Sequence, residues 1–175
     1  MATASNYFPE GALASSKQVD DFRAEWFSKC LRDTDEPPLW PPRADRRPTF
    51  RYLALPSFDK PFVVRVERDD RGGWDLSATL IDCGESGRDA ARVVRRVHRK
   101  LWWFERWRLE ARSKRLAFWD LPPYDEERAG LDGTTEVLEG ADAGRYHIVH
   151  RWCPPRGPFR SFCRYLSGLK GFNAR

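Results

Sequence analysis

The sequence predicts an α+β domain in which an antiparallel sheet of about six strands packs with an N-terminal, a central and a C-terminal helix. Apolar residues follow helical spacing near both ends of the chain, and short β-branched and aromatic runs separated by turn residues fill the middle. The 8 Trp and 11 Phe supply apolar surface for one core, and 175 residues fit one domain. We therefore expect a flexible N-terminus over residues 1–14 and a single α+β domain over residues 15–175.

The first predicted element is an amphipathic helix within residues 15–33. Ser15 or Ser16 can accept hydrogen bonds from its first free amides, and the acidic residues that follow suit the positive end of the helix dipole. Its apolar face comprises Val19, Phe22, Trp26, Phe27, Cys30 and Leu31. Five prolines within residues 37–48 predict an extended connector, because proline fits neither a helix interior nor a central strand.

Three antiparallel strands are expected next, within residues 50–58, 61–70 and 73–84. Each is rich in β-branched and aromatic residues, and the sequence Asp-Asp-Arg-Gly-Gly between the second and third suits a tight turn. Residues 91–101 are ambiguous, because their valines fit either one helical face or a strand. We favour a fourth strand there.

A central helix is expected from about Leu101 to Arg115. Glu110 and Lys114 are four residues apart, a pairing that supports a helix. Helical spacing leaves Trp102 as the one good candidate for an exposed aromatic platform. The side chains expected to face the core are Trp103, Phe104, Trp107 and Ala111.

A second hairpin is expected within residues 134–152, followed by a terminal helix. A turn centred on Asp142 and Ala143 would pair Val137 with Ile148 across the hairpin. The terminal helix has a stop signal at Gly171. Its apolar face comprises Phe159, Phe162, Cys163, Leu166 and Leu169.

The net charge of +5 is unevenly distributed along the chain. Residues 88–115 contain eleven Lys and Arg against three acidic residues, a net +8, so the remainder carries −3. Such a block suits an acidic partner. We expect another protein with an acidic surface, with nucleic acid as the alternative, while a coding bias toward arginine would explain the block without a ligand. The candidate binding residues are Arg95, Arg96, Arg99, Trp102, Arg106 and Arg112.

Membrane and export signals are not found. The longest uncharged apolar runs fall far short of the roughly 20 residues that cross a bilayer, so no membrane span is expected. The first residues lack a basic region followed by an apolar run, which predicts a cytoplasmic protein. The scattered cysteines are expected to be free thiols. They are Cys30, Cys83, Cys153 and Cys163.

Signatures of catalysis are few. The sequence has no Gly-rich phosphate loop, no nucleophile elbow and no paired Cys-x-x-Cys motif. A nucleophilic Cys153 or Cys163 activated by His147 or His150 stays open, because such partners meet only in the fold. The acidic loop at residues 120–127 could hold a cation, although a solvated loop is the simpler interpretation.

His147, His150 and Cys153 follow one another at three-residue spacing, which raises the question of a metal site. Strand residues an odd number of positions apart point to opposite faces of a sheet, so the two histidines would be separated. A zinc ion needs convergent ligands. We therefore expect no metal ion here, and no cofactor.

Five segments together carry a family resemblance: FRAEWFSKCLRDTDEPPLW, FRYLALPSFDKPFVVRVERD, FWDLP, LDGTTEVLEG and YHIVHRWCP. They are similar to the pattern of an uncharacterised family of small bacterial proteins, over about residues 22–169. The resemblance implies a fold and no established activity, and many members look exported or lipid-anchored. This chain departs from the pattern at Glu136, where the family has Trp, and at His150, where it has Asp. The matching residues of unknown role include Asp132, Glu139, His147 and Arg151.

The expected function is a non-catalytic domain that binds another macromolecule. The inhibitor, or immunity partner, of a bacterial toxin is one specific form of it, because such proteins are small and bind by charge complementarity. A nucleic-acid-binding protein that uses residues 88–115 is the alternative. A thiol or imidazole enzyme is the second alternative.

Overall fold

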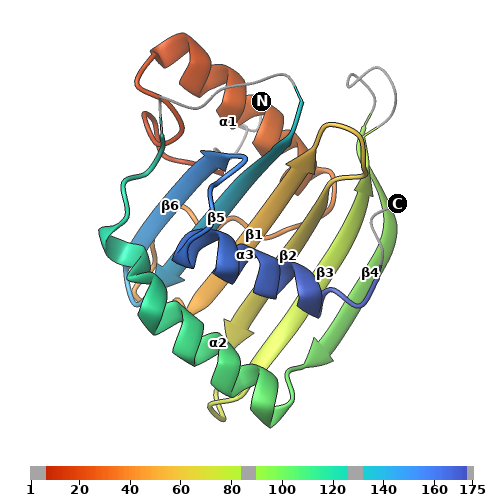
Figure 1. Cartoon of the computed structure of the whole chain (residues 1–175), viewed down its shortest axis with the longest axis vertical. Helices are drawn as coiled ribbons and strands as arrows, with labels where there is room; N and C mark the ends of the chain where they lie inside the picture. Colours follow the sequence, from red (N-terminus) through yellow and green to blue (C-terminus); the bar gives the residue numbers. More distant parts are fainter. Residues whose placement is uncertain (1–6, 84–89, 126–131, 173–175) are drawn as a thin grey trace.

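The computed structural model describes residues 7–83, 90–125 and 132–172. It confirms the predicted α+β fold, with one antiparallel sheet in the order β4-β3-β2-β1-β5-β6 (Figure 1). The strands are β1 (Thr49–Pro56), β2 (Phe62–Arg68), β3 (Trp74–Asp82), β4 (Arg92–Lys100), β5 (Thr134–Asp142) and β6 (Arg145–Trp152). The helices are α1 (Lys17–Arg32), α2 (Trp103–Leu116) and α3 (Pro158–Leu169), with a 3-10 turn at Phe118–Asp120.

The sheet is covered on both faces along β1, β2, β3 and β5, where consecutive residues are buried. Helices α2 and α3 cross one face of the sheet. Helix α1 packs on the opposite face, toward the other end of the molecule (Figure 1). Alternate residues of β1 and β2 therefore enter different cores: Tyr52 and Val64 join the α2–α3 core, while Leu53 and Val63 join the α1 core. The predicted sheet is thus the middle layer of three.

The segment before α1 is packed rather than loose. Tyr7, Phe8 and Leu13 are buried in the α1 core, although the sequence predicted a flexible end up to residue 14. The Asp20 carboxylate of α1 accepts hydrogen bonds from the backbone amides of residues 11, 13 and 14 at 2.8, 2.7 and 3.2 Å. The described part of the packed domain therefore begins before residue 15.

Residues 92–100 form strand β4, as favoured from the sequence, and this strand lies at the edge of the sheet. The second hairpin is also confirmed, but its predicted register is wrong. Val137 pairs with His150 instead of Ile148, because the turn is centred on Ala143 and Gly144. Both turn residues have positive φ, as a tight hairpin turn requires. The shift of two residues leaves every side chain on its predicted face.

Helix α2 forms where expected but presents the opposite face to the core. Trp103, Phe104 and Trp107 were predicted to face inward, and all three are exposed. Leu109 and Leu116 are the buried residues of this helix. Trp107 and Leu109 are two residues apart, which at 3.6 residues per turn is a rotation of about 200°, so they point to nearly opposite sides of the helix. Ala111 is exposed as well.

Helix α1 shows a smaller error of the same kind. Its predicted apolar face was too wide, since Phe22 and Trp26 are exposed while Phe27, Cys30 and Leu31 are buried. The two exposed rings contact each other with centroids 6.1 Å apart. A third exposed residue is Val19.

A buried ion pair joins β1 to β5. Arg51 and Glu139 are cross-strand neighbours, and both side chains are fully buried. The guanidinium donates from Nε to Oε2 at 2.6 Å and from Nη2 to Oε1 at 2.7 Å. Arg51 also donates to the Pro37 carbonyl at 2.6 Å, and the Tyr146 hydroxyl donates to Glu139 at 2.9 Å. The Arg51 guanidinium carbon lies over the Tyr7 ring, 5.5 Å from its centroid.

Replacing one partner of this pair should destabilise the fold strongly. We expect Glu139→Ala to lower the free energy of unfolding by about 3 to 5 kcal/mol, because it leaves the Arg51 charge buried without its counter-ion. Urea denaturation followed by tryptophan fluorescence measures the loss.

Two controls test the cause of that loss. The double variant Arg51→Met with Glu139→Leu should recover most of the stability, because apolar residues replace both charges. Asp45→Ala, which removes the exposed partner of Arg43, should leave unfolding unchanged within error. A Glu139→Ala variant as stable as the wild type would show that the pair does not hold the strands together.

Candidate functional site

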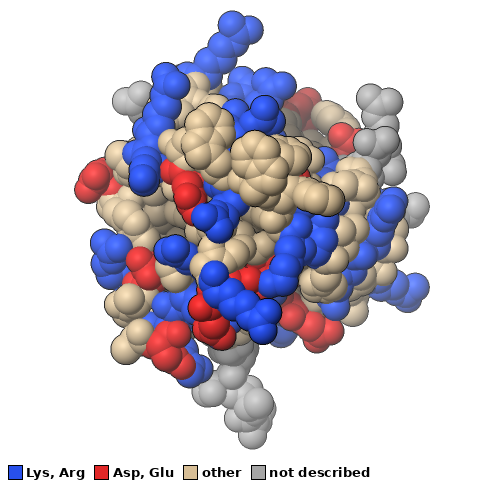
Figure 2. Space-filling model, turned by 90° about the horizontal axis from the view of Figure 1, so that it is seen from below, with Lys and Arg blue, Asp and Glu red and all other residues tan. Residues whose placement is uncertain are grey.

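Four aromatic side chains gather on the surface where α2 begins. Trp102, Trp103, Phe104 and Trp107 are 66%, 79%, 40% and 66% exposed, and we call them the aromatic surface. Figure 2 views the molecule from below, the end where α2 lies in Figure 1, and shows aromatic rings gathered among blue Lys and Arg side chains. Exposed apolar side chains gathered in this way make this surface a candidate interaction site.

The backbone beneath the aromatic surface is held by Glu105. Its carboxylate accepts a hydrogen bond from the Trp102 amide at 2.9 Å and two from the Arg99 guanidinium at 2.7 and 2.8 Å. The hydrogen bond from Arg99 lowers the pKa of this carboxyl. The Glu105 backbone carbonyl accepts a hydrogen bond from the Tyr165 hydroxyl of α3 at 2.6 Å. Contacts to β4 and α3 therefore fix the start of α2.

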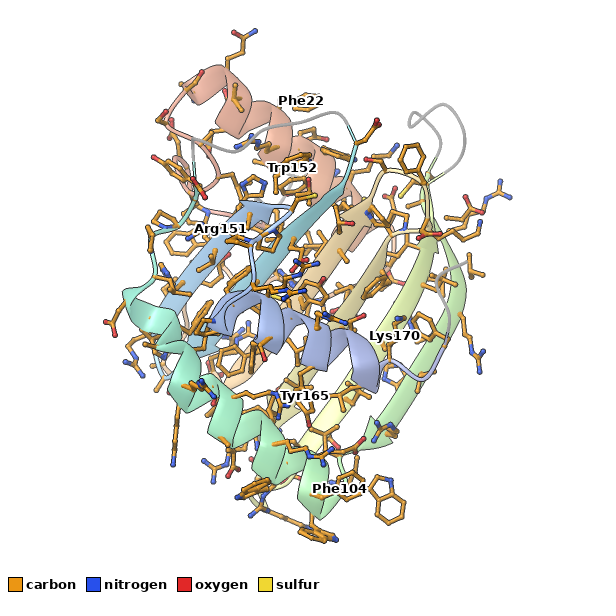
Figure 3. All side chains as sticks on the ribbon, viewed as in Figure 1. Phe22, Phe104, Arg151, Trp152, Tyr165 and Lys170 are labelled. Atoms are coloured by element: carbon orange, nitrogen blue, oxygen red, sulfur yellow. The ribbon has the colours of Figure 1, made fainter. Side chains whose placement is uncertain are left out.

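Two arginines border the aromatic surface. The Arg108 guanidinium lies over the Phe104 ring, 5.9 Å from its centroid, and Phe104 itself projects from the lower end of the molecule (Figure 3). Arg106 donates to the Gly72 carbonyl at 3.2 Å and lies 3.6 Å from the Glu110 carboxylate. The surface thus combines large rings with positive charge at its margin.

The basic residues predicted to bind do not form one surface. Arg95 and Arg99 lie on the face of β4 that carries α2 and α3, whereas Arg96 lies on the opposite face. Arg96 donates to the Thr34 carbonyl and, at 3.4 Å, to the Thr79 hydroxyl. Arg99 is paired with Glu105. Strand alternation therefore divides the predicted set.

The other two predicted arginines and Trp102 lie on or beside α2. Trp102 and Arg106 belong to the region of the aromatic surface, as described above. Arg112 lies farther along the helix, with its guanidinium 4.7 Å from the centroid of the Tyr165 ring. Sequence reasoning missed Trp103, Phe104 and Trp107.

Three residues of the family pattern make structural contacts. Glu139 belongs to the buried ion pair. A ring nitrogen of His147 lies 2.8 Å from the Leu121 carbonyl, and Arg151 donates to the Pro122 carbonyl at 2.6 Å. These two side chains fasten the segment after α2 to β6. Asp132 is exposed at the start of the β5 region.

The histidines of β6 lie on opposite faces of the sheet, as the strand pattern predicted. His147 contacts Phe118 in the α2–α3 core, and His150 contacts Phe27 in the α1 core. Cys153 leaves the strand with a positive φ of 41°. Among residues 7–83, 90–125 and 132–172, no group of three His, Cys, Asp or Glu side chains is arranged to hold a metal ion. The acidic loop at residues 120–127 lies partly outside this described range.

The cysteines proposed as nucleophiles have neighbours other than histidine. Cys163 is buried and interacts with Glu136, and burial raises the pKa of its thiol well above the usual value. The sulfur of Cys153 accepts a hydrogen bond from the Thr134 amide at 3.3 Å. Within the described residues, neither sulfur forms a hydrogen bond with a histidine.

No family model, curated protein or solved structure matches this chain. None of the helices in the described part of the chain is long and apolar enough to cross a membrane.

His150 should make folding sensitive to acid. Its imidazole is buried with Nδ1 unpartnered, and burial, with Arg23 and Arg151 nearby, lowers its pKa from 6.5 to about 4. Between these values the unfolded chain binds a proton that the folded protein does not, so stability falls as pH decreases from about 6.5 to about 4. We expect a loss of about 3 kcal/mol over this window.

Urea denaturation at half-unit pH steps measures this loss. His150→Gln should flatten the dependence in that window, whereas His98→Gln, which replaces an exposed histidine, should leave it as in the wild type. Identical curves for the wild type and His150→Gln would show that the imidazole is not kept neutral by the fold.

Proposed function

We propose that this protein is a non-catalytic binding domain whose partner is a protein with an acidic surface. The observation that carries the proposal is the exposure of Trp102, Trp103, Phe104 and Trp107 on a firmly held helix start. Burying these rings against a partner would remove a large apolar area from water, at about 25 cal/mol per Å².

The composition of the surface favours a protein partner. Tryptophan and arginine are the residue types most enriched at the energetic centres of protein interfaces. Arg106 and Arg108 stand at the margin of the rings, where charge guides the encounter and selects an acidic partner. The inhibitor of a bacterial toxin remains the specific form of this proposal, since it needs such a surface and no catalytic group.

A single-stranded nucleic acid is the second candidate. Bases stack on exposed tryptophan rings while nearby arginines contact phosphates, and Trp103 and Trp107 lie close to Arg106 on the same helix. This candidate differs from a protein partner in its salt dependence, because each phosphate contact steepens the decrease of affinity with salt.

The test is a comparison of two double variants. Trp103→Ala with Trp107→Ala should weaken binding to the partner at least about thirtyfold, because the loss of even one central interface aromatic costs about 2 kcal/mol or more. Phe22→Ala with Trp26→Ala, which removes exposed rings of α1, is the matched control and should bind as the wild type does. Both variants should retain the wild-type melting temperature, since the rings are exposed.

The measurement begins with capture from the native host at about 150 mM salt and continues with titration calorimetry on the purified partner. Equal affinity of the two double variants would refute the role of the aromatic surface. Nucleic acid would be favoured instead by a gel shift with a single-stranded oligonucleotide at about 50 mM salt that disappears by about 200 mM. This shift should also be lost in Trp103→Ala with Trp107→Ala.

A further inference from the structure

A second basic feature lies between α2 and α3, away from the aromatic surface. Two hollows of about 410 and 480 Å³ share Arg112, Gly157 and Ser161 in their linings. Tyr165 lies between the two helices in Figure 3 and lines the larger hollow. We call this feature the arginine groove. The arginines that line it are Arg112, Arg115, Arg156, Arg160 and Arg164.

The groove arginines differ from other arginines of the protein in how they are paired. Elsewhere the guanidinium groups of Arg43, Arg99 and Arg145 pair with carboxylates. None of the five groove arginines forms an ion pair with a carboxylate of residues 7–83, 90–125 or 132–172. Arg112 instead packs on the Tyr165 ring, which fixes its guanidinium at the edge of the groove.

This arrangement is unfavourable in the absence of an anion. Arg160 and Arg164 are four residues apart on α3, and Arg112 and Arg115 are three apart on α2, so each helix carries like charges as neighbours. Helix α3 also has no acidic residue in its first turn, where a negative charge would suit the helix dipole. A bound anion would reduce the repulsion between the arginines. It would also supply the negative charge that suits the start of α3.

One buried carboxylate interacts with an arginine of the groove. Glu136 of β5 is buried and interacts electrostatically with Arg160. Burial raises the pKa of this carboxyl, while the Cys163 hydrogen bond and Arg160 oppose the rise. Glu136 does not line either hollow, and the charged residues that do are all arginines.

We propose that the arginine groove binds a small ligand that carries two or more phosphate groups. Planar guanidinium groups donate paired hydrogen bonds that match phosphate oxygens, and several arginines around one hollow suit a ligand with several negative charges. The two adjoining hollows accommodate linked phosphates. This inference is independent of the proposed protein partner, because the groove and the aromatic surface share no side chain.

The test uses the full chain and sodium tripolyphosphate as the probe. We expect tripolyphosphate to raise the melting temperature by about 5 °C near saturation, and citrate at matched ionic strength to raise it much less. Calorimetry should show at least tenfold weaker binding for Arg160→Ala with Arg164→Ala. The matched control is Arg43→Ala with Arg145→Ala, which removes two exposed arginines elsewhere and should bind as the wild type does.

The outcomes also identify the source of the phosphates. A nucleoside triphosphate that binds as tightly as tripolyphosphate indicates a free phosphorylated metabolite, whereas a preference for an oligonucleotide that depends on Arg160 and Arg164 indicates a nucleic acid backbone. Equal stabilisation by tripolyphosphate and citrate, or equal binding by the two double variants, overturns the proposal. Neither result bears on Trp103 and Trp107, so the two proposals fail separately.

Two cysteines that were expected to be separate free thiols lie next to each other. The sulfur of Cys30 in α1 lies 3.6 Å from the sulfur of Cys83, which follows β3. Cys30 is buried and Cys83 is partly exposed. The pair connects α1 to the sheet across 53 positions of the chain.

We further propose that Cys30 and Cys83 form a reversible disulfide with a small-molecule disulfide such as oxidised glutathione as the oxidant. The Cys83 thiolate attacks one glutathione sulfur, forms a mixed disulfide and releases one glutathione thiolate. Cys30 then loses its proton, and its sulfur displaces the second glutathione as the Cys30–Cys83 bond forms. The protein loses two hydrogen atoms, and oxidised glutathione is reduced to two glutathione molecules.

The order of attack follows from the environment of each thiol. The hydrogen bond from Cys30 lowers the pKa of Cys83, and Lys29 contributes in the same direction. That hydrogen bond and burial raise the pKa of Cys30. Cys83 is also the more accessible sulfur, so it reacts with the oxidant first.

Oxidation with glutathione disulfide should reduce the number of thiols titrated in denaturant from four to two. It should also raise the melting temperature, because the bond restricts the unfolded chain. Cys30→Ser should stop at a glutathione adduct on Cys83, and Cys153→Ser should oxidise as the wild type does. Peptide mapping of the oxidised protein identifies the bond. A wild-type adduct on Cys83 that never resolves, or a bond that includes Cys153 or Cys163, overturns the proposal.

Discussion

The buried Arg51–Glu139 ion pair links the central strands of the sheet to the proline-rich connector and to the second hairpin. Its two residues stand side by side on β1 and β5, and neither reaches water. A buried charge pair is tolerable only when its remaining donors and acceptors are satisfied. Here the Pro37 carbonyl of the connector and the Tyr146 hydroxyl of β6 supply those partners. The pair thereby fixes where the proline-rich connector and the second hairpin lie relative to the central strands.

Strand alternation explains why the sheet could be predicted from the sequence. It also explains why the segments that pack on the second face of the sheet could not. A period of two residues places His147 and His150 on opposite faces whatever the register, so that conclusion survived a register error of two residues. The alternation does not say whether a second face is exposed or covered. The burial of Tyr7 and Leu13 depends on Asp20 and on contacts across the chain, and no local pattern in the first residues signals them.

Three of the four residues of the aromatic surface were missed, because helical spacing alone does not identify which face of a helix is buried. Trp103 and Trp107 form one apolar stripe on α2, and Leu109 and Leu116 form another on the opposite side. The sequence interpretation chose the stripe with the larger side chains. A signal was present, however. Four aromatic residues within six consecutive positions, 102–107, cover more of the helix circumference than one core face can take.

The firmly held start of α2 bears on how its exposed rings can act. A binding surface that is already ordered loses less conformational entropy on association, so more of its contact energy appears as affinity. Glu105 orders this start by joining Arg99 of β4 to the Trp102 amide, and its carbonyl is held by Tyr165 of α3. The charge of Arg99, predicted as a ligand contact, is thus used within the protein. In the proposed function Arg99 contributes position, because it holds the backbone from which the tryptophan rings project.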